Sequence, residues 1–329
     1  MYTSDSYPSQ SDRHHIALLL DVARRYYVAG ESQADIASAI SFSRPTVSRL
    51  LTEARQRGIV QLKISHPLER LASLEAQLTE AFGLKSARVA DASSDVNTAS
   101  EVVRCAASLL VESCNEDSLI TVSNGSAVAA TVSAVPQMHW PRSRVVQMIG
   151  SLGQENPMTD SPEVCRRLAW QLGGAFHALS VPLVLSSSAI AASMRQEAQI
   201  AATLALGGRA EVALVGVGTV QVGRSGHIFD AYETPETVAA LVKAGAVAHI
   251  CGHHISRDGE HIATPICKRT ISIDPERMRQ IPLVIGVAWG SQKVQALRAV
   301  MRGGFISALV TDKQTAEQLL MSPPVKTPQ

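Results

Sequence analysis

From residue 86 onward the sequence alternates short apolar runs with amphipathic stretches, and this alternation restricts the possible folds more than any other feature. The apolar runs have the length of strands and cover residues 87–90, 119–122, 144–149, 177–181, 212–217, 247–250, 283–287 and 308–311. Helical patterns separate most of them, at residues 98–113, 126–135, 162–172, 196–206, 234–244, 292–302 and 313–320. Such an order is typical of a parallel sheet covered by helices on both faces. The sequence therefore predicts a doubly wound, mostly parallel α/β domain over residues 85–322.

Glycine and small polar residues follow several of the predicted strands. They form five segments, at residues 123–127, 150–157, 216–223, 251–259 and 288–293. Ligands of such sheets bind beyond the carboxyl ends of the strands, and a glycine turn that enters a helix can bind an anion through backbone N–H groups. We expect a pocket there for a small polyhydroxylated or phosphorylated ligand, with Lys293 as a cationic contact. The candidate binding residues are Ser123, Gly125, Ser126, Gly150, Gln154, Asn156, Gly218, His253, His254, Ser256, Gly290, Ser291 and Lys293.

Other kinds of site fit these segments less well. Gly216-x-Gly218 begins like a dinucleotide-binding fingerprint, but Gln221 stands where the third glycine is needed. Four histidines and Cys251 fall within residues 249–261, and their spacing matches no zinc-binding pattern. The serines at the strand ends lack the context of a hydrolase nucleophile. We therefore predict no metal site, no cofactor and no catalytic residues.

Residues 30–60 predict two short helices joined by a tight turn. Ser32 and Ser43 are suited to cap the two helices, and Pro45 falls in the first turn of the second helix, where a missing N–H is harmless. The second helix can bury a stripe made of Val47, Leu50, Leu51 and Ala54. This is the layout of a helix-turn-helix, whose second helix enters the major groove of DNA. The candidate DNA contacts are Gln33, Ser43, Arg44, Thr46, Ser48, Arg49 and Arg55.

Charge supports this interpretation. Residues 44–63 hold five basic side chains and one acid, Glu53, so the segment carries +4, whereas the whole chain carries +1. Arginine can read a guanine edge, and a helix N-terminus favours phosphate. The alternative is an ordinary helical hairpin with a solvated basic face. Because the overall charge is near zero, any DNA contact must be local.

The rest of the N-terminal part predicts a small domain and a connecting helix. Residues 13–29 form an amphipathic helix with Ile16, Leu19, Leu20, Ala23 and Tyr27 on one face. Residues 59–65 alternate as a half-buried strand does, which would make a wing. Residues 68–82 place leucines and Phe82 at nearly heptad spacing, which favours a dimer contact over packing within the chain. We expect a DNA-binding domain at 13–66, a linker and dimerisation helix at 67–84, and disordered tails at 1–12 and 323–329.

Composition sets the cellular context. Hydrophobic residues make up 46 % and aromatic residues 4 % of the chain, as expected for parallel sheets buried on both faces. The five cysteines include no CxxC pair and are expected to be reduced thiols. The N-terminus lacks the apolar region of a signal peptide, and no run of about 18 apolar residues could span a membrane. The sequence thus predicts a cytoplasmic protein without a membrane partner.

With both halves described, the chain resembles the SorC family of bacterial sugar-responsive transcriptional regulators. The resemblance runs from about Arg24 to Leu320. It rests on RRYYVAGESQADIASAI and SRPTVSRLLTEARQRGIVQLKI in the head, and on VVQMIG, GSLGQENP, GAVAHICG, IGVAWGSQKVQALRAVMRGG and ALVTDKQTA in the larger domain. It implies an effector domain similar in fold to sugar-phosphate isomerases, a dimeric or tetrameric assembly, and a phosphorylated sugar or polyol as the effector.

The resemblance also assigns roles to residues. Gly125-Ser126 matches a loop that binds phosphate or hydroxyl groups, and Lys293 matches a Gly-x-x-Lys phosphate contact. Ile255-Ser256 departs from the family, in which many members have Phe-Asp, so the effector is expected to differ from that of typical members. The implied function is a regulator whose affinity for double-stranded operator DNA is controlled by a sugar, polyol or sugar phosphate. Two alternatives remain: an isomerase-like or deaminase-like enzyme with an ancillary helical head, and a module whose head binds protein.

Overall fold

The computed structural model describes residues 10–60, 67–91, 95–153, 157–221, 224–225 and 234–321. The chain divides into two compact units, Met1–His66 and Pro67–Gln329. The predicted strand at 59–65 and both predicted tails fall largely outside the described residues. None of the described helices combines the length and apolar character that crossing a bilayer requires.

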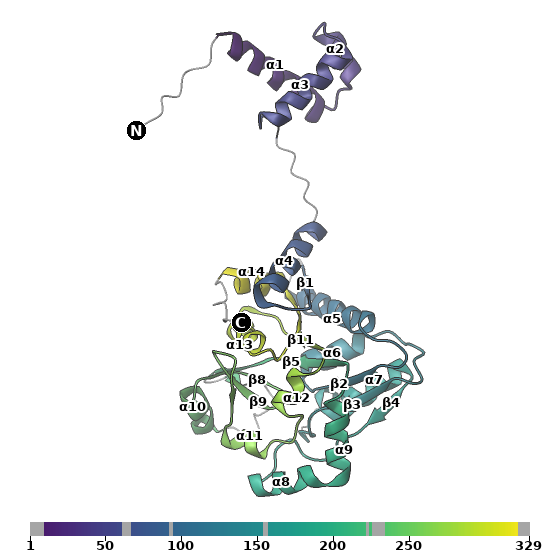
Figure 1. The fold of residues 1–329 in the computed structure, drawn as a ribbon, viewed down its shortest axis with the longest axis vertical. Helices are drawn as coiled ribbons and strands as arrows, with labels where there is room; N and C mark the ends of the chain where they lie inside the picture. Colours follow the sequence, from purple (N-terminus) through teal and green to yellow (C-terminus); the bar gives the residue numbers. More distant parts are fainter. Residues whose placement is uncertain are drawn as a thin grey trace. The chain divides into compact units, whose positions relative to one another are not determined.

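The first unit is a bundle of three helices around one small core. The helices are α1 (Gln10–Tyr27), α2 (Gln33–Ala39) and α3 (Arg44–Gln56) (Figure 1). Its buried residues are Leu19, Val22, Ala23, Ile36, Ala37, Val47, Leu50, Leu51 and Ala54. The predicted stripe of α3 is therefore confirmed. The predicted buried face of α1 is wrong at one position. Leu20 is 38 % exposed, and Val22 is buried in the core in its place.

The second unit is built on a sheet of seven parallel strands, which confirms the predicted α/β class. Their order is β1-β12-β11-β5-β2-β3-β4, and each neighbouring pair is parallel. The strands are β1 (Ser86–Ala90), β2 (Leu119–Val122), β3 (Arg144–Gln147), β4 (Ala175–His177), β5 (Val212–Gly216), β11 (Leu283–Val287) and β12 (Ala308–Asp312). Strand order reverses between β2 and β5, so their carboxyl ends form the switch point at which such sheets bind ligands.

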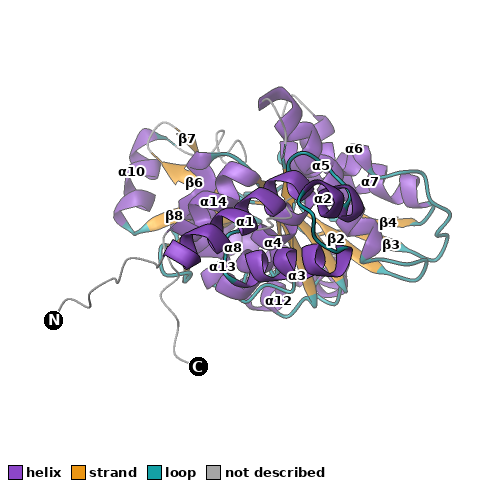
Figure 2. Cartoon of the chain, turned by 90° about the horizontal axis from the view of Figure 1, so that it is seen from above, coloured by secondary structure: helices purple, strands orange, loops and turns teal. Residues whose placement is uncertain are grey.

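Helices cover both faces of this sheet and create two separate cores. One face carries α5 (Asp95–Glu112), α6 (Ser126–Ala134) and α7 (Ser161–Leu172), which lie together on one side of the strands in Figure 2. The other face carries α4 (Pro67–Phe82), α9 (Ala198–Gly207), α12 (Pro275–Arg279), α13 (Val294–Arg302) and α14 (Lys313–Met321). Strand β5 shows the division, since Val212 and Leu214 face the first core and Ala213 and Val215 the second.

A second, antiparallel sheet lies outside the sequence prediction. Its strands, in the order β10-β9-β8-β6-β7, are β10 (His261–Ile262), β9 (His253–Ser256), β8 (Ala246–Ile250), β6 (Gly218–Gln221) and β7 (Arg224–Ser225). The prediction that 247–250 belongs to the parallel sheet is wrong, because its neighbours on both sides run antiparallel to it. Segments 216–223 and 251–259 are likewise not plain strand-end loops, since each contributes a strand here.

The remaining elements are short. They are α8 (Ser188–Gln196), α10 (Pro235–Lys243), α11 (Pro265–Arg269), η1 (Pro157–Thr159) and η2 (Ser291–Lys293). The prediction for 196–206 missed α8, which ends where α9 begins. The strand predicted at 177–181 is displaced, because β4 ends at His177.

Helix α4 uses its leucine stripe within its own chain. Leu78 is fully buried in the core that α4 shares with β1, and Leu71, Leu74 and Phe82 pack partly against it. The side chain of Glu75 accepts a hydrogen bond from the backbone N–H of Val89 in β1 at 2.8 Å. A dimer contact through α4, which stays a prediction, would have to use the other residues of the helix.

Candidate functional site

The start of α3 is fixed by the serine that the sequence predicted as its cap. The Oγ of Ser43 accepts a hydrogen bond from the backbone N–H of Thr46 at 3.3 Å and lies 2.8 Å from the Oγ1 of Thr46. Just before it, Ser41 adopts a positive φ of 57°, which turns the chain sharply between α2 and α3. Gly58, at φ 71°, follows the helix in the left-handed conformation common after a helix end.

The outer face of α3 is polar and open. Arg44, Ser48, Arg49 and Arg55 are exposed, and Thr46 is half-buried. A surface hollow of about 600 Å³ runs along this face, lined by Ser48, Arg49, Thr52, Glu53, Gln56 and Arg57. Of the predicted DNA contacts of α3, Ser48 and Arg49 line this hollow.

The one acid of this face is already paired. The Oε1 of Glu53 lies 2.8 Å from the Nε2 of His15 and 2.7 Å from the Nη2 of Arg57. The hydrogen bond with His15 is the main cause that lowers the pKa of this carboxyl group. Glu53 therefore ties α3 to α1, and Arg44, Arg49 and Arg55 are left to face an anion.

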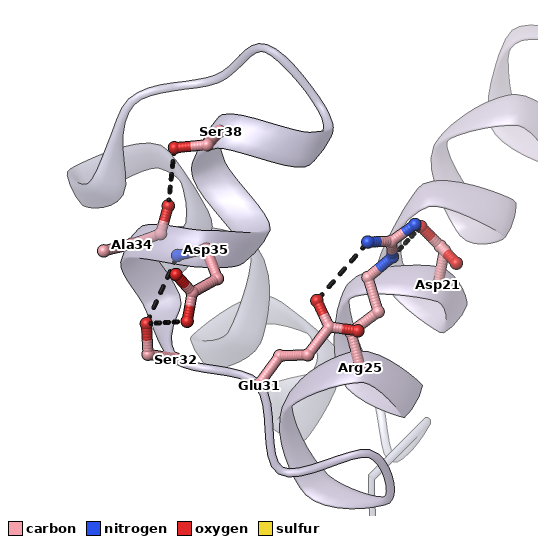
Figure 3. A network of polar contacts seen from close by, with 7 residues as sticks. All are labelled: Asp21, Arg25, Glu31, Ser32, Ala34, Asp35 and Ser38. Carbon is pink, nitrogen blue, oxygen red and sulfur yellow. Dashed lines mark hydrogen bonds and ion pairs between the residues drawn. The ribbon is translucent and has the colours of Figure 1, made fainter.

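Polar contacts also fix the entry to α2 (Figure 3). The Oγ of Ser32 accepts from the backbone N–H of Asp35 at 3.2 Å and donates to its Oδ2 at 2.7 Å. Arg25 of α1 donates to Asp21 at 3.2 Å and to Glu31 at 3.4 Å, so the segment before α2 is held against α1. Gln33, a predicted DNA contact, is half-buried in the first turn of α2.

In the larger unit, the carboxyl ends of β2, β5 and β11 meet. The Nζ of Lys293 donates to the carbonyl oxygen of Val217 at 3.0 Å, which joins the turn after β11 to the end of β5. A Cβ placed on Gly216 would lie 3.8 Å from the carbonyl oxygen of Asn124, so the turn after β2 is adjacent as well. Burial lowers the pKa of the Lys293 ammonium group. A half-buried cation thus lies at the switch point.

The turn after β2 offers unused donors beside this cation. Gly125 has a φ of 111° and caps α6 without a side-chain hydrogen bond, so the cap residue does not occupy the first N–H groups of α6. Among the described residues, the Nδ2 of Asn124 is buried without a hydrogen-bond partner. Ser123 is buried and Ser126 is exposed. The sequence analysis missed Asn124; its place in a glycine turn after an apolar strand was the available signal.

The turn after β11 differs from its prediction in one respect. The backbone N–H of Gly290 donates to the Oδ2 of Asp312 and to the Oγ1 of Thr315, each at 2.9 Å. This N–H therefore already has acceptors within the protein, while Ser291 is exposed in the first turn of η2. Of the predicted residues in this turn, Lys293 has the clearest position for binding an anion.

Two predicted glycines have a packing role instead. A Cβ on Gly150 would lie 2.6 Å from the backbone of Leu183, and a Cβ on Gly218 would lie 1.8 Å from the Nε2 of His249. Gly150 also donates to the carbonyl oxygen of Ile271 at 2.9 Å. Near it, residues 151–153 and 178–182 border a cavity of about 510 Å³. Gln154 and Asn156 lie outside the described residues.

The predicted residues of segment 251–259 are on β9 rather than in a loop. The Oγ of Ser256 accepts from the backbone N–H groups of Asp258 at 3.2 Å and Glu260 at 3.1 Å. These contacts stabilise the β9–β10 turn and use the Ser256 oxygen as an acceptor, while its O–H can still donate to a ligand. His254 is fully buried, with its Nδ1 3.3 Å from the Sγ of Cys267.

His253, His254 and His261 surround Cys267, which the sequence analysis did not associate with them. Burial alone would raise the pKa of the Cys267 thiol, but contacts with the three imidazoles lower that pKa to about 3. The sequence spacing gave no indication of this group, because Cys267 belongs to α11 and approaches the histidines only through tertiary packing.

Comparison with known proteins gives a consistent match. Residues 66–321 match the protein family described as "Putative sugar-binding domain". The chain is 28 % identical to the deoxyribonucleoside regulator of Bacillus subtilis, over 94 % of this chain and 99 % of the relative. It is 29 % identical to the sorbitol operon regulator of Klebsiella pneumoniae, over 93 % and 98 %. The crystal structure of that full-length regulator, SorC, superimposes with a TM-score of 0.75 at 29 % identity, covering 93 % of this chain and 99 % of that one.

Proposed function

The chain belongs to the SorC family of transcriptional regulators, and we propose that its head binds operator DNA with an affinity that a sugar-type effector controls from the larger unit. Of the relatives named above, one is named a sorbitol operon regulator and the other a deoxyribonucleoside regulator. A carbohydrate, polyol or sugar phosphate is therefore the class of effector we propose for this chain. The enzyme alternative is not supported, since these relatives are regulators.

The observation that carries the DNA-binding proposal is the outer face of α3. Its N-terminus is capped by Ser43, its inner face is buried, and Arg44, Ser48 and Arg49 are exposed together. Arginine forks match guanine edges in the major groove, and hydroxyls can bind phosphates. Glu53 is paired with His15 and Arg57. Its negative charge therefore repels DNA phosphates less than the sequence alone suggests.

The effector proposal rests on the switch point. Lys293, the open turn of α6 and the Nδ2 of Asn124 provide a cation and several N–H donors at adjacent strand ends. Donors of this kind suit phosphate or hydroxyl oxygens. For regulation, the effector must bind one arrangement of the regulator better than the other, because equal affinity would shift no equilibrium.

We also propose that the regulator acts in the cytoplasm as a homodimer or homotetramer. Helix-turn-helix proteins read paired half-sites, which requires two heads per operator. The apolar stripe of α4 is engaged in its own core, so the surface that pairs the subunits is proposed to lie elsewhere. Light scattering of the full chain over a range of concentrations tests this, and a monomer at all concentrations with tight operator binding would contradict it.

A band-shift assay on the DNA upstream of the protein's own gene tests the DNA-binding face. The double variant Arg44→Ala/Arg49→Ala should lose specific binding. Its remaining affinity for DNA should depend less on salt concentration than that of the unmodified protein. The control is Arg104→Ala/Arg166→Ala, which removes two exposed arginines of the larger unit and should bind as the unmodified protein does. Equal binding by both double variants would exclude α3 as the reading helix.

A thermal-shift screen of sugars, polyols and their phosphates identifies the effector, because a ligand of the folded state raises the melting temperature. Each hit is then added to the band-shift assay. We expect at least one hit to change operator affinity. Hits that stabilise the protein but leave DNA binding unchanged would contradict effector control without affecting the DNA-binding proposal.

A further inference from the structure

Three potential metal ligands lie together in the larger unit, and one of them, His253, is also among the candidate effector residues. They are His253 at the start of β9, His261 on β10 and Cys267 on α11. One ring nitrogen of each histidine and the Sγ of Cys267 all lie within 4.8 Å of one another. The pairing of β9 with β10 places His261 opposite Ile255, so the two histidines come from a hairpin and the cysteine from the helix that follows.

The ring of His253 is oriented by contacts on its far side. Its Nε2 lies 3.0 Å from the carbonyl oxygen of Ile273 and 2.8 Å from the Oγ of Ser272. A carbonyl only accepts, so Nε2 carries the proton and Nδ1 holds a lone pair. This Nδ1 is buried without a hydrogen-bond partner, in a residue that is only 4 % exposed. Metal-binding histidines are held by a carbonyl through the other ring nitrogen in this same way.

The other two ligands are similarly prepared. The Nε2 of His261 is buried without a hydrogen-bond partner. Cys267 is 6 % exposed, and its backbone N–H donates to the Oγ1 of Thr264, the cap of α11, at 3.1 Å. In a tetrahedral zinc site with bonds of about 2.0–2.3 Å, ligand atoms lie roughly 3.5 Å apart. Side-chain movements of about 1 Å would therefore close the site.

A cavity adjoins the three ligands. Its volume is about 500 Å³, and its lining includes His253, His261, Cys267, Ser272, Asp274 and Arg195. A site with three protein ligands beside open space can hold a water molecule or an anionic ligand in the fourth position. Arg195, Lys268 and Arg277 also border the cavity, and these cations favour an anion in that position over a fourth protein ligand.

We propose that His253, His261 and Cys267 bind one transition-metal ion of the zinc class, with an open fourth position facing this cavity. One thiolate and two imidazoles suit Zn²⁺ and Co²⁺, whereas Mg²⁺ and Ca²⁺ require oxygen ligands. The ion links the β9–β10 hairpin to α11 and so stabilises the smaller sheet. The three proposed ligands include neither a proposed operator contact nor Lys293.

The test uses the full chain, stripped of metal with a chelator and titrated with Co²⁺ and then Zn²⁺. One equivalent of Co²⁺ should bind and give thiolate-to-cobalt charge-transfer absorption, which Zn²⁺ should abolish by displacement. Zn²⁺ should also raise the melting temperature. Absence of the charge-transfer band, or its persistence in Cys267→Ser, would overturn the proposal.

Substitution of single ligands supplies the controls. His261→Gln, at a half-buried position, should keep the fold by circular dichroism and weaken Co²⁺ binding at least about tenfold. Cys105→Ser and His139→Gln replace a half-buried cysteine and an exposed histidine elsewhere, and both should bind Co²⁺ with unchanged affinity. Equal losses in these controls, or full affinity in His261→Gln, would contradict the assignment.

Discussion

The Nζ of Lys293 donates a hydrogen bond to the carbonyl oxygen of Val217 across 3.0 Å, and this contact joins the segments that follow two strands through residues 76 apart in the sequence. The ammonium group is thereby held at the point where strand order reverses. Two of its hydrogens remain for a ligand, because an ammonium group has three donors.

Lys293→Met keeps the length of the side chain and removes its charge. We expect the affinity for phosphorylated effectors to fall about 10- to 100-fold, as for a lost hydrogen bond to a charged group. Unphosphorylated ligands should lose less. Calorimetric titration with matched pairs of hits checks this, and Lys313→Met, which removes a lysine paired with Asp91, is the control. If only unphosphorylated polyols bind, the anion-binding role of Lys293 is wrong.

Ser43→Ala removes the cap of α3. The backbone N–H of Thr46 loses its side-chain acceptor and keeps only the carbonyl oxygen of Ser43 at 2.9 Å, so the stability of the head should fall by about 0.5–2 kcal/mol. Hydrogen exchange of the α3 amides in the absence of DNA measures this separately from any DNA contact. Ser38→Ala, on the exposed side of α2 where the hydroxyl bonds only to Ala34 (Figure 3), should change exchange little. Similar protection in both variants would show that the cap is not needed.

Gly218→Ala places a Cβ 1.8 Å from the Nε2 of His249. The overlap should cost about 1–3 kcal/mol or more in the free energy of unfolding, measured by urea denaturation. Gly216→Ala, whose Cβ meets nothing closer than 3.5 Å, is the matched control. Adding His249→Ala should make Gly218→Ala far less costly than it is in the unmodified background. Strictly additive losses would show that the two residues do not interact.

The free energy of unfolding should decrease on acidification because His249 is buried. Burial, followed by repulsion from His254 and Lys293, lowers the pKa of this imidazole to about 3. Below about pH 6.5 the unfolded chain binds a proton at this histidine and the folded chain does not, so the free energy of unfolding falls as the pH drops toward 3. The limiting slope for one group is about 1.4 kcal/mol per pH unit.

Urea denaturation at pH 7, 6 and 5 checks this prediction. His249→Asn should show a shallower loss of stability on acidification than the unmodified protein, and His139→Asn, at an exposed position, should match the unmodified slope. A slope in His249→Asn equal to that of the unmodified protein would mean that His249 is accessible to protons in the folded state.

The parallel sheet could be predicted because its strands are buried on both faces and therefore consist of continuous apolar runs, as in β2 and β5. The helix caps at Ser32 and Ser43 were equally predictable, since each serine Oγ accepts a hydrogen bond from the backbone N–H only three residues further along. These local or periodic signals also explain why the capped start and the buried stripe of α3 were predicted correctly.

The smaller sheet and the histidine–cysteine group could not be predicted in this way. Strand β9 begins with two histidines and so lacks the apolar alternation of a strand. Strands β6 and β8, which pair with each other, are 28 residues apart in the sequence, counting from Gly218 to Ala246, and each is too short to identify alone. Cys267 reaches the histidines only because α11 folds back beside β9, which no spacing pattern encodes.

The division of β5 between two cores has a consequence for how regulators of this type diversify. Because Val212 and Leu214 support one layer and Ala213 and Val215 the other, a single-residue insertion in the strand would exchange the two sets and damage both layers at once. The turns beyond the strand ends are free of that constraint. In the proposed effector site, a change at a turn residue such as Asn124 would therefore alter ligand preference without displacing either core layer.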